Sequence, residues 1–166
     1  MNTIPDQFTT KAVGVTFAPN YPESIYQLSE IHLERMGPRP DCTACLPDDD
    51  AILANAVMRS RCRVCRNTGK VGGNSPRFSG FEPGDVEPIA AVLRRNKQNQ
   101  YDSNAIEIHI PALGQMIGHI NKSLAAQLAE LIDNGQQFMA GVASVLIMPG
   151  KEENPGISLI IRKVDR

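Results

Sequence analysis

The sequence predicts a mainly β domain of the α+β class, a small and strongly bent six-stranded sheet or barrel with one or two helices. Three observations predict this fold. Six short segments show the apolar and polar pattern that is typical of strands. One segment repeats its leucines at helical spacing. All four cysteines fall in one stretch of different composition, which indicates an inserted module.

The composition is that of one globular domain, or of one domain with an insertion. The chain has 166 residues, of which 42% are hydrophobic and 21% charged. With five Phe, three Tyr and no Trp, the core must be mostly aliphatic. The formal net charge of -1 excludes a broadly basic protein that coats phosphates. A nucleic-acid ligand would therefore need a local patch or a small pocket.

The N-terminal residues MNTIPDQFTTKAVG lack the basic and apolar regions of a signal peptide. No run approaches the ~18 apolar residues that a membrane span needs. We therefore expect a soluble, cytoplasmic protein with no membrane partner.

The first part of the barrel is expected at residues 11–35. Residues 11–17 (KAVGVTF) predict a strand, residues 20–22 a turn, and residues 24–34 a helix. In that helix Ile25, Leu28 and Ile31 fall on one face. The sequence GPRP, at residues 37–40, then ends the helix, because proline and glycine both break regular structure.

The remainder of the barrel is expected at residues 81–164. Strands are predicted at residues 89–95, 105–110, 115–120, 137–147 and 157–164, with a hairpin turn at residues 111–114. A helix is predicted at residues 123–133, where Leu124, Leu128, Leu131 and Ile132 form one apolar stripe. Asn121 or Ser123 could cap its first turn, and Gly135 could end it.

The module between these parts, residues 36–80, contains the cysteine pairs Cys42/Cys45 and Cys62/Cys65. Two CxxC pairs at this spacing are typical of a structural zinc site, because each pair turns both sulfurs toward one ion. Four thiolates leave no open position, so one Zn²⁺ would be structural rather than catalytic. Disulfides or free thiols are the alternative, which a cytoplasmic chain disfavours. Redox use of one pair is a further possibility.

A basic cluster lies in the same module. Residues 51–80 contain six Lys or Arg and no Asp or Glu. The cluster could bind phosphates. It could equally balance the charge of the thiolates and keep the module soluble. The sequence favours neither interpretation.

The segment QYDSNAIEI, at residues 100–108, begins with turn-forming residues and ends as a half-buried strand. Together with the following residues through Gly135 it resembles the HIRAN domain, whose pattern is Asn-Pro-Tyr-Asp-x-Asn-Ala-Ile, then Gly-x-x-Ile/Val-Gly-His/Tyr-Ile, then a Leu/Ala-rich helix. The positions that fit are Asn99, Tyr101, Asp102, Asn104, Ala105, Ile106, Ile117, Gly118, His119 and Ile120. The resemblance covers about residues 13–30 and 81–164, and the cysteine-rich module lies outside it.

The resemblance implies a small OB-like or SH3-like barrel that binds single-stranded DNA at its 3′-hydroxyl end, in DNA repair or replication and alongside a DNA-processing protein. It places six residues in the DNA site: Phe17, Asn99, Tyr101, Asp102, His119 and Lys122. A base could stack on Tyr101 or Phe17, and Asp102 could accept a hydrogen bond from the hydroxyl. His119 and Lys122 could contact phosphates, and Asn99 could support the loop or bond a sugar or base edge.

Two positions depart from the family pattern. The proline before the tyrosine is Gln100 here, so the turn is less rigidly fixed. An arginine of the DNA-binding eukaryotic members corresponds to Thr16, which removes one expected contact.

Each candidate also has a purely structural interpretation. Tyr101 could lie at the edge of the core, and Asp102 and Asn104 could only cap the turn. His119 could be a half-buried histidine between Ile117 and Ile120, and Lys122 could simply be solvated.

Three functions remain open from the sequence. The first is a non-enzymatic DNA-end recognition module with a structural zinc site. The second is a protein-interaction adaptor that uses the zinc module as its contact surface. The third, a hydrolase, is the least supported, because no paired carboxylates with a histidine occur at metal-site spacing.

Overall fold

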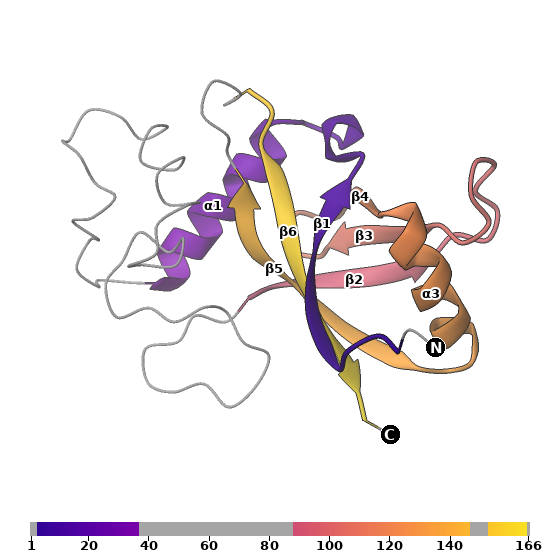
Figure 1. Cartoon of the computed structure of the whole chain (residues 1–166). Coiled ribbons are helices and arrows are strands. Elements are labelled where there is room, and N and C mark those ends of the chain that lie inside the picture. The colour runs from indigo at the N-terminus through magenta and orange to yellow at the C-terminus, as the bar shows by residue number, and fades with distance from the viewer. Residues whose placement is uncertain (1–2, 37–87, 147–152, 166) are drawn as a thin grey trace.

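The computed structural model describes residues 3–36, 88–146 and 153–165. Within these residues, six strands form a closed antiparallel barrel in the order β1-β4-β3-β2-β5-β6, with an α-helix on either side of it (Figure 1). The elements are β1 (Gln7–Val13), the 3-10 turn η1 (Val15–Phe17), α1 (Glu23–Met36), β2 (Ile89–Arg95), β3 (Ile106–Ile110), β4 (Gln115–Ile120), α3 (Lys122–Asp133), β5 (Gln137–Leu146) and β6 (Gly156–Val164). The predicted six-stranded barrel with helices is confirmed.

Two strands close the barrel by changing partners along their length. The first part of β1 pairs with β6, and its last two residues, Ala12 and Val13, pair with β4. Likewise β2 pairs first with β5 through residues 89–91 and then with β3 through residues 92–95. A strand that pairs with different neighbours along its two halves bends between them. These bends in β1 and β2 close the sheet into a barrel.

The barrel interior is aliphatic, as the composition predicts. In β3, Ile106, Ile108 and Ile110 are fully buried, whereas Glu107 and His109 between them face outward. This is the period of two that a half-buried strand requires. The largest fully buried side chains are all isoleucine or leucine: Ile25, Leu28, Ile89, Ile106, Ile108, Ile110, Ile117, Leu128, Ile157, Leu159 and Ile161.

Helix α3 begins and ends where the sequence predicts. The Asn121 side chain accepts a hydrogen bond from the Leu124 N–H at 3.0 Å, so Asn121 is the cap. At the other end Gly135 has a φ of 88°, and the Gln136 N–H reaches the Leu131 carbonyl at 2.9 Å. Glycine adopts this left-handed conformation without strain, which lets the chain close the last turn and leave the helix.

The prediction of a strand at residues 11–17 is wrong at both ends, because β1 runs from Gln7 to Val13. Gly14 has a φ of 69°, which takes the chain out of the strand, and the Phe17 N–H then closes η1 on the Gly14 carbonyl at 3.1 Å. The strand also begins earlier, at Gln7, because this polar segment pairs with β6. Phe17 therefore lies in an exposed turn rather than at a strand end.

The predicted zinc ligands Cys42, Cys45, Cys62 and Cys65 lie outside the described residues, as does the predicted insertion apart from Met36, which ends α1. The zinc site and the domain boundaries thus stay predictions. In the described part of the chain, no helix is long and apolar enough to cross a membrane.

Candidate nucleic-acid interface

The loop between β2 and β3, residues 96–105, is held in shape by its own side chains. Asn99 Oδ1 accepts hydrogen bonds from the N–H groups of Tyr101 at 2.9 Å and of Asp102 at 3.1 Å. Asp102 Oδ1 accepts from the Asn104 N–H at 2.9 Å. The backbone adds the Ala105 N–H to the Asp102 carbonyl at 3.0 Å. The turn-capping roles of Asn99 and Asp102 are therefore observed, and Asn99 fixes the turn that lacks the family proline at Gln100.

These contacts leave two groups of the loop facing solvent. The Tyr101 side chain is 82% exposed, so it is not a ring at the edge of the core. Asp102 is half-buried, and its second carboxylate oxygen, Oδ2, has no hydrogen bond to the described residues. A flat apolar ring and an available carboxylate oxygen on adjacent residues can together contact a base and a hydroxyl group.

The end of β4 lies beside the exit of this loop. Since β3 starts directly after the loop and Glu107 pairs with His119, the half-buried His119 sits next to the first residues of β3. On its other side His119 pairs with Val13, an exposed residue at the end of β1. His119 is thus an outward-facing residue of the barrel surface.

Glu107 forms a polar cluster beside His119. Its carboxylate contacts His109 Nε2 at 2.9 Å and accepts a hydrogen bond from Asn96 Nδ2 at 2.7 Å. The hydrogen bond with His109 holds the pKa of Glu107 below its ordinary range, aided by Asn96 and opposed by partial burial. The sequence-based interpretation did not single out these residues, although strand alternation places Glu107 and His109 on the outer face.

Lys122 is the first residue of α3 and is exposed. The positive end of the helix dipole disfavours a cation at this position. The first turn contains no acidic residue, and its capping bonds involve the N–H groups of Leu124 and Ala125. An anion placed here would meet both the Lys122 ammonium group and the remaining backbone N–H groups at the helix start.

Phe17 lies on η1, which follows β1 and packs against β4. Its side chain is 90% exposed on η1. The segment after η1 is bonded to the start of β4, where Gln115 Nε2 donates to the Pro19 carbonyl at 2.8 Å. Gly14, at the start of η1, lies beside the His119 ring, because a Cβ added to Gly14 would be 3.8 Å from His119 Nδ1. The structure thus gathers Asn99, Tyr101 and Asp102 in one loop. It places His119 next to Glu107 near the exit of that loop and brings the start of η1, the turn that carries Phe17, to the other side of His119.

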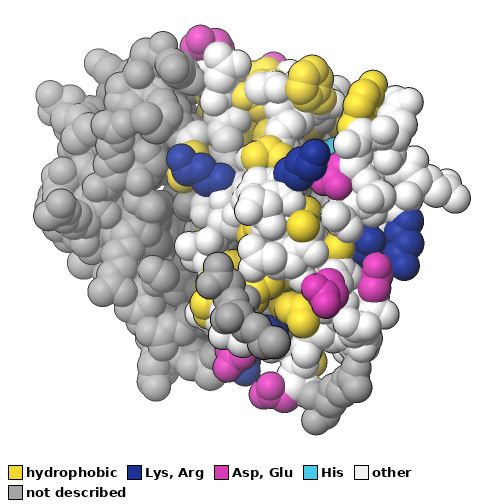
Figure 2. Space-filling model, turned by 45° about the vertical axis from the view of Figure 1, so that its right-hand side comes forward, with side chains coloured by type: hydrophobic (Ala, Val, Ile, Leu, Met, Phe, Trp, Pro, Cys, Tyr) yellow, Lys and Arg dark blue, Asp and Glu magenta, His cyan; other side chains and the backbone are white. Residues whose placement is uncertain are grey.

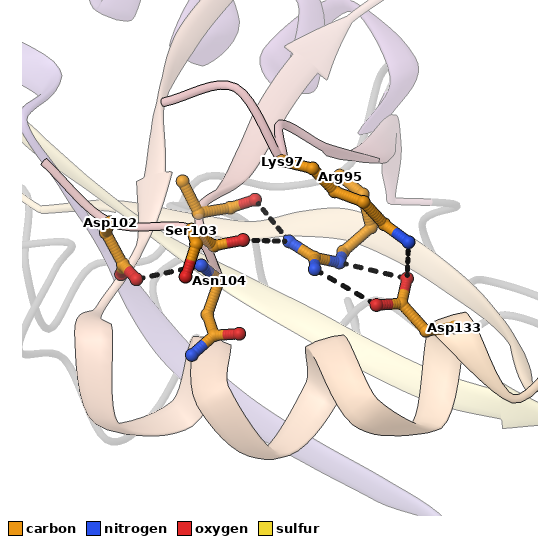
Figure 3. A network of polar contacts seen from close by, with 7 residues as sticks. Arg95, Lys97, Asp102, Ser103, Asn104 and Asp133 are labelled. Atoms are coloured by element: carbon orange, nitrogen blue, oxygen red, sulfur yellow. Dashed lines mark hydrogen bonds and ion pairs between the residues drawn. The ribbon is translucent and has the colours of Figure 1, made fainter. Parts of the chain in front are cut away.

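Sequence reasoning missed Arg95, the last residue of β2. Its guanidinium group donates to the carbonyl oxygens of Ser103 and Ala105, each at 3.2 Å, and to the Asp133 carboxylate at 3.1 and 3.3 Å (Figure 3). The unusual feature in the sequence is Asp133, a carboxylate at the C-terminal end of a helix, where the dipole disfavours negative charge.

Charge is mixed over the surface that Figure 2 presents. Lys or Arg and Asp or Glu side chains are scattered over the described residues in view, with hydrophobic side chains exposed between them. A surface of this kind favours recognition through a few placed groups over attraction by a broad positive field.

Comparison with known proteins gives one family. The family model of the HIRAN domain matches residues 10–162. The helicase-like transcription factor of Mus musculus is 34% identical over 79 residues, which are 41% of this chain and 8% of that protein. The same protein of Homo sapiens is 36% identical over 74 residues, 38% of this chain and 7% of its own length. The chain thus spans less than a tenth of these curated relatives.

Two solved structures are also similar. The crystal structure of the HIRAN domain of human HLTF has a TM-score of 0.37 and 27% identity, and covers 46% of this chain and 59% of its own. A crystal structure of a protein from Lactobacillus plantarum has a TM-score of 0.44 and 16% identity, and covers 98% of this chain and 94% of its own.

Proposed function

Because this chain belongs to the HIRAN family, we propose that it is a non-catalytic module that binds single-stranded DNA at a free 3′-hydroxyl end. The observation that carries the proposal is the pairing of an exposed aromatic ring with an available carboxylate oxygen, Tyr101 and Asp102, on a loop whose backbone is fixed by its own hydrogen bonds. A fixed loop loses little conformational freedom when it binds, so it serves as a preformed site.

Tyr101 provides the stacking surface for the terminal base. An exposed large ring in water is unfavourable unless a partner covers it. Base stacking on such a ring contributes ~1–3 kcal/mol and tolerates any sequence, because every base has a π-face. This supports recognition of an end rather than of a sequence.

Asp102 distinguishes a 3′-hydroxyl end from a 3′-phosphate end. One carboxylate oxygen is used by the Asn104 N–H at 2.9 Å, and the other can accept a hydrogen bond from a terminal hydroxyl. A terminal phosphate would lose that donor and would bring a second negative charge to the same place. Breaking a charge-assisted hydrogen bond alone costs ~1.5–3 kcal/mol, so the hydroxyl end should bind at least about tenfold more tightly.

His119 and Lys122 serve the phosphates that precede the end. Lys122 stands at the N-terminus of α3, where a cation is disfavoured in the free protein and a phosphate would relieve this. His119 faces outward between the end of β1 and the start of β3. Phe17 would contact a further base, since the start of η1 lies beside His119.

The test compares oligonucleotides of about ten nucleotides that differ only in a 3′-hydroxyl or a 3′-phosphate group, with Kd measured by fluorescence anisotropy from a 5′ label. Tyr101→Ala should weaken both ligands. Asp102→Asn keeps an oxygen for the Asn104 N–H but removes the charge, so it should mainly reduce the preference for the hydroxyl. Ser103→Ala, an exposed neighbour, should change neither Kd. Equal affinity of the unmutated protein for both ends would refute end recognition.

A second candidate function is a protein-interaction adaptor. The net charge of -1 and the mixed charges of the surface in Figure 2 favour it, because both give little general attraction to nucleic acid. Absence of binding to either oligonucleotide would favour this adaptor. For the DNA-binding function, the helicase-like name of the relatives supports a DNA-processing protein as the partner. A role in DNA repair or replication rests on the family resemblance alone.

We also propose that Cys42, Cys45, Cys62 and Cys65 bind one structural Zn²⁺. The support is the spacing of the two CxxC pairs in the sequence, which suits a tetrahedral site with four thiolate ligands.

A further inference from the structure

Arg95 links the β2–β3 loop to the end of α3. In Figure 3 its guanidinium group lies between the loop carbonyls and the Asp133 carboxylate. One nitrogen, Nη1, donates to the carbonyls of Ser103 and Ala105, each at 3.2 Å. The other two, Nε and Nη2, donate to both oxygens of Asp133 at 3.3 and 3.1 Å. Arginine is suited to this because its donors form a rigid fork, which a lysine lacks.

Arg95 is the better shielded of two links between the loop and α3. Lys97, a loop residue, also contacts Asp133 at 3.2 Å, but its side chain is 65% exposed. In the part of the chain that the structure describes, all other hydrogen bonds of residues 99–105 are to residues 96–105 themselves. Those bonds set the shape of the loop. Asn96 joins its start to Glu107 of β3 at 2.7 Å, whereas Arg95 joins its end to α3. The Arg95 side chain is 11% exposed, so solvent competes little for its donors.

Asp133 occupies a position that helix electrostatics disfavour. It is the last residue of α3, at the negative end of the helix dipole. Two cations compensate, because Arg95 contacts both oxygens, at 3.1 and 3.3 Å, and Lys97 contacts Oδ1 at 3.2 Å. The hydrogen bond from Arg95 holds the pKa of Asp133 below its ordinary range. The carboxylate is thus placed to hold Arg95 rather than to stabilise the helix.

We propose that Arg95 and Asp133 are positioning residues for the DNA-end site. Helix α3 carries Lys122 at its first residue and, through Asp133 at its last, fixes the loop that carries Tyr101 and Asp102. One helix therefore sets the relative position of the phosphate contact and of the end contact. The inference rests on the proposed function, since it concerns the same site. It adds that the preference for a 3′-hydroxyl depends on residues that do not touch the DNA.

The test uses a pair of matched variants, Arg95→Met and Lys97→Met. Each removes one positive charge beside Asp133, but only Arg95 also contacts the loop carbonyls. The hydroxyl and phosphate oligonucleotides are compared for each variant, because loss of stability alone weakens both ligands equally. Arg95→Met should reduce the discrimination from about tenfold to about threefold or less, because hydrogen bonds weaken steeply when misaligned. Lys97→Met also removes a contact between the loop and Asp133, but an ion pair this exposed contributes little, so the discrimination should stay unchanged.

A second pair covers the case in which Arg95→Met fails to fold. Asp133→Asn keeps the shape of the side chain and loses the charge, and it should reduce the discrimination in the same direction. Arg95→Lys keeps the charge without the fork and should give an intermediate value. Amide hydrogen exchange of Asn104 and Ala105 in the DNA-free protein should accelerate in Arg95→Met and Asp133→Asn but not in Lys97→Met.

The outcomes separate the two proposals. If the unmutated protein binds both ends equally, the proposed function fails. If it prefers the hydroxyl and the Arg95 and Asp133 variants keep that preference, only the positioning role is overturned. Loop amides that exchange at the unmutated rate in Arg95→Met would show that the guanidinium group does not fix the loop.

Discussion

Gly118 in β4 packs so closely against β1 that there is no space for a side chain. Its φ is 155°, and an added Cβ would lie 2.7 Å from the Val13 carbonyl oxygen and 3.3 Å from Val15 Cγ2. The first of these atoms belongs to the backbone of β1, so it cannot rotate away. Gly118→Ala must therefore separate β1 from β4 at the point where β1 changes partner.

The cost has two parts. A backbone conformation reserved for glycine costs roughly 1–3 kcal/mol for another residue, and displacement of β1 adds to this. We expect a total loss of about 2–4 kcal/mol in the free energy of unfolding. With a urea m-value of about 2 kcal/mol per M, the unfolding midpoint should fall by roughly 1–2 M.

The assay is urea unfolding followed by circular dichroism, with Gly114→Ala as the matched control. Gly114 also has a positive φ, 66°, but an added Cβ would meet nothing within 4 Å. The control should therefore lose only about 1–2 kcal/mol, which is the cost of the left-handed conformation. A midpoint for Gly118→Ala no lower than that for Gly114→Ala would refute the close approach of β1 to β4.

Three further predictions follow from the site and the sequence. The hydrogen bonds that lower the pKa of Glu107 in the folded state contribute stability at pH values above the ordinary pKa of a glutamate, and this stability is lost as the pH falls through the lower folded-state pKa. The urea midpoints of the unmutated protein and Glu107→Gln should therefore converge as the pH falls, and a constant difference would contradict this. Lys122→Ala should weaken DNA binding and flatten the plot of log Kd against log salt concentration by about one phosphate contact, whereas an unchanged slope would remove Lys122 from the interface. Elemental analysis of protein purified without added metal should find about one zinc per chain, and metal-free protein with two disulfides would contradict the zinc site. Cys62→Ser should release the zinc while the circular dichroism of the barrel persists. Global unfolding of Cys62→Ser would contradict the expected domain boundary.

The sequence predicts those elements whose stability is local. The bounds of β2 and β4 and the caps of α3 agree with prediction, since alternation, capping and turn-forming residues act over a few positions. The first residues of β1 could not be predicted in this way. Their segment QFTTK is mostly polar, and it is a strand because it pairs with β6, which is about 150 residues away in the chain.

In the candidate site, too, local features could be predicted from the sequence and long-range contacts could not. The turn chemistry of Asn99 and Asp102 follows from the residues themselves. Their proposed role in binding a DNA end rests on the family resemblance, because stacking rings and turn carboxylates are common in proteins of any function. The contacts of Arg95 were not predicted, since Asp133 is 38 residues away and only the folded barrel brings the two together.

Competition between linear and circular forms of one single strand tests the central claim most directly. Both forms have the same bases and backbone phosphates, and only the linear form has a 3′-hydroxyl end. If Tyr101 and Asp102 recognise that end, the circular strand should displace a labelled linear strand at least about tenfold less effectively. Equal displacement by the two forms would contradict end recognition, whatever the affinity of the protein for DNA.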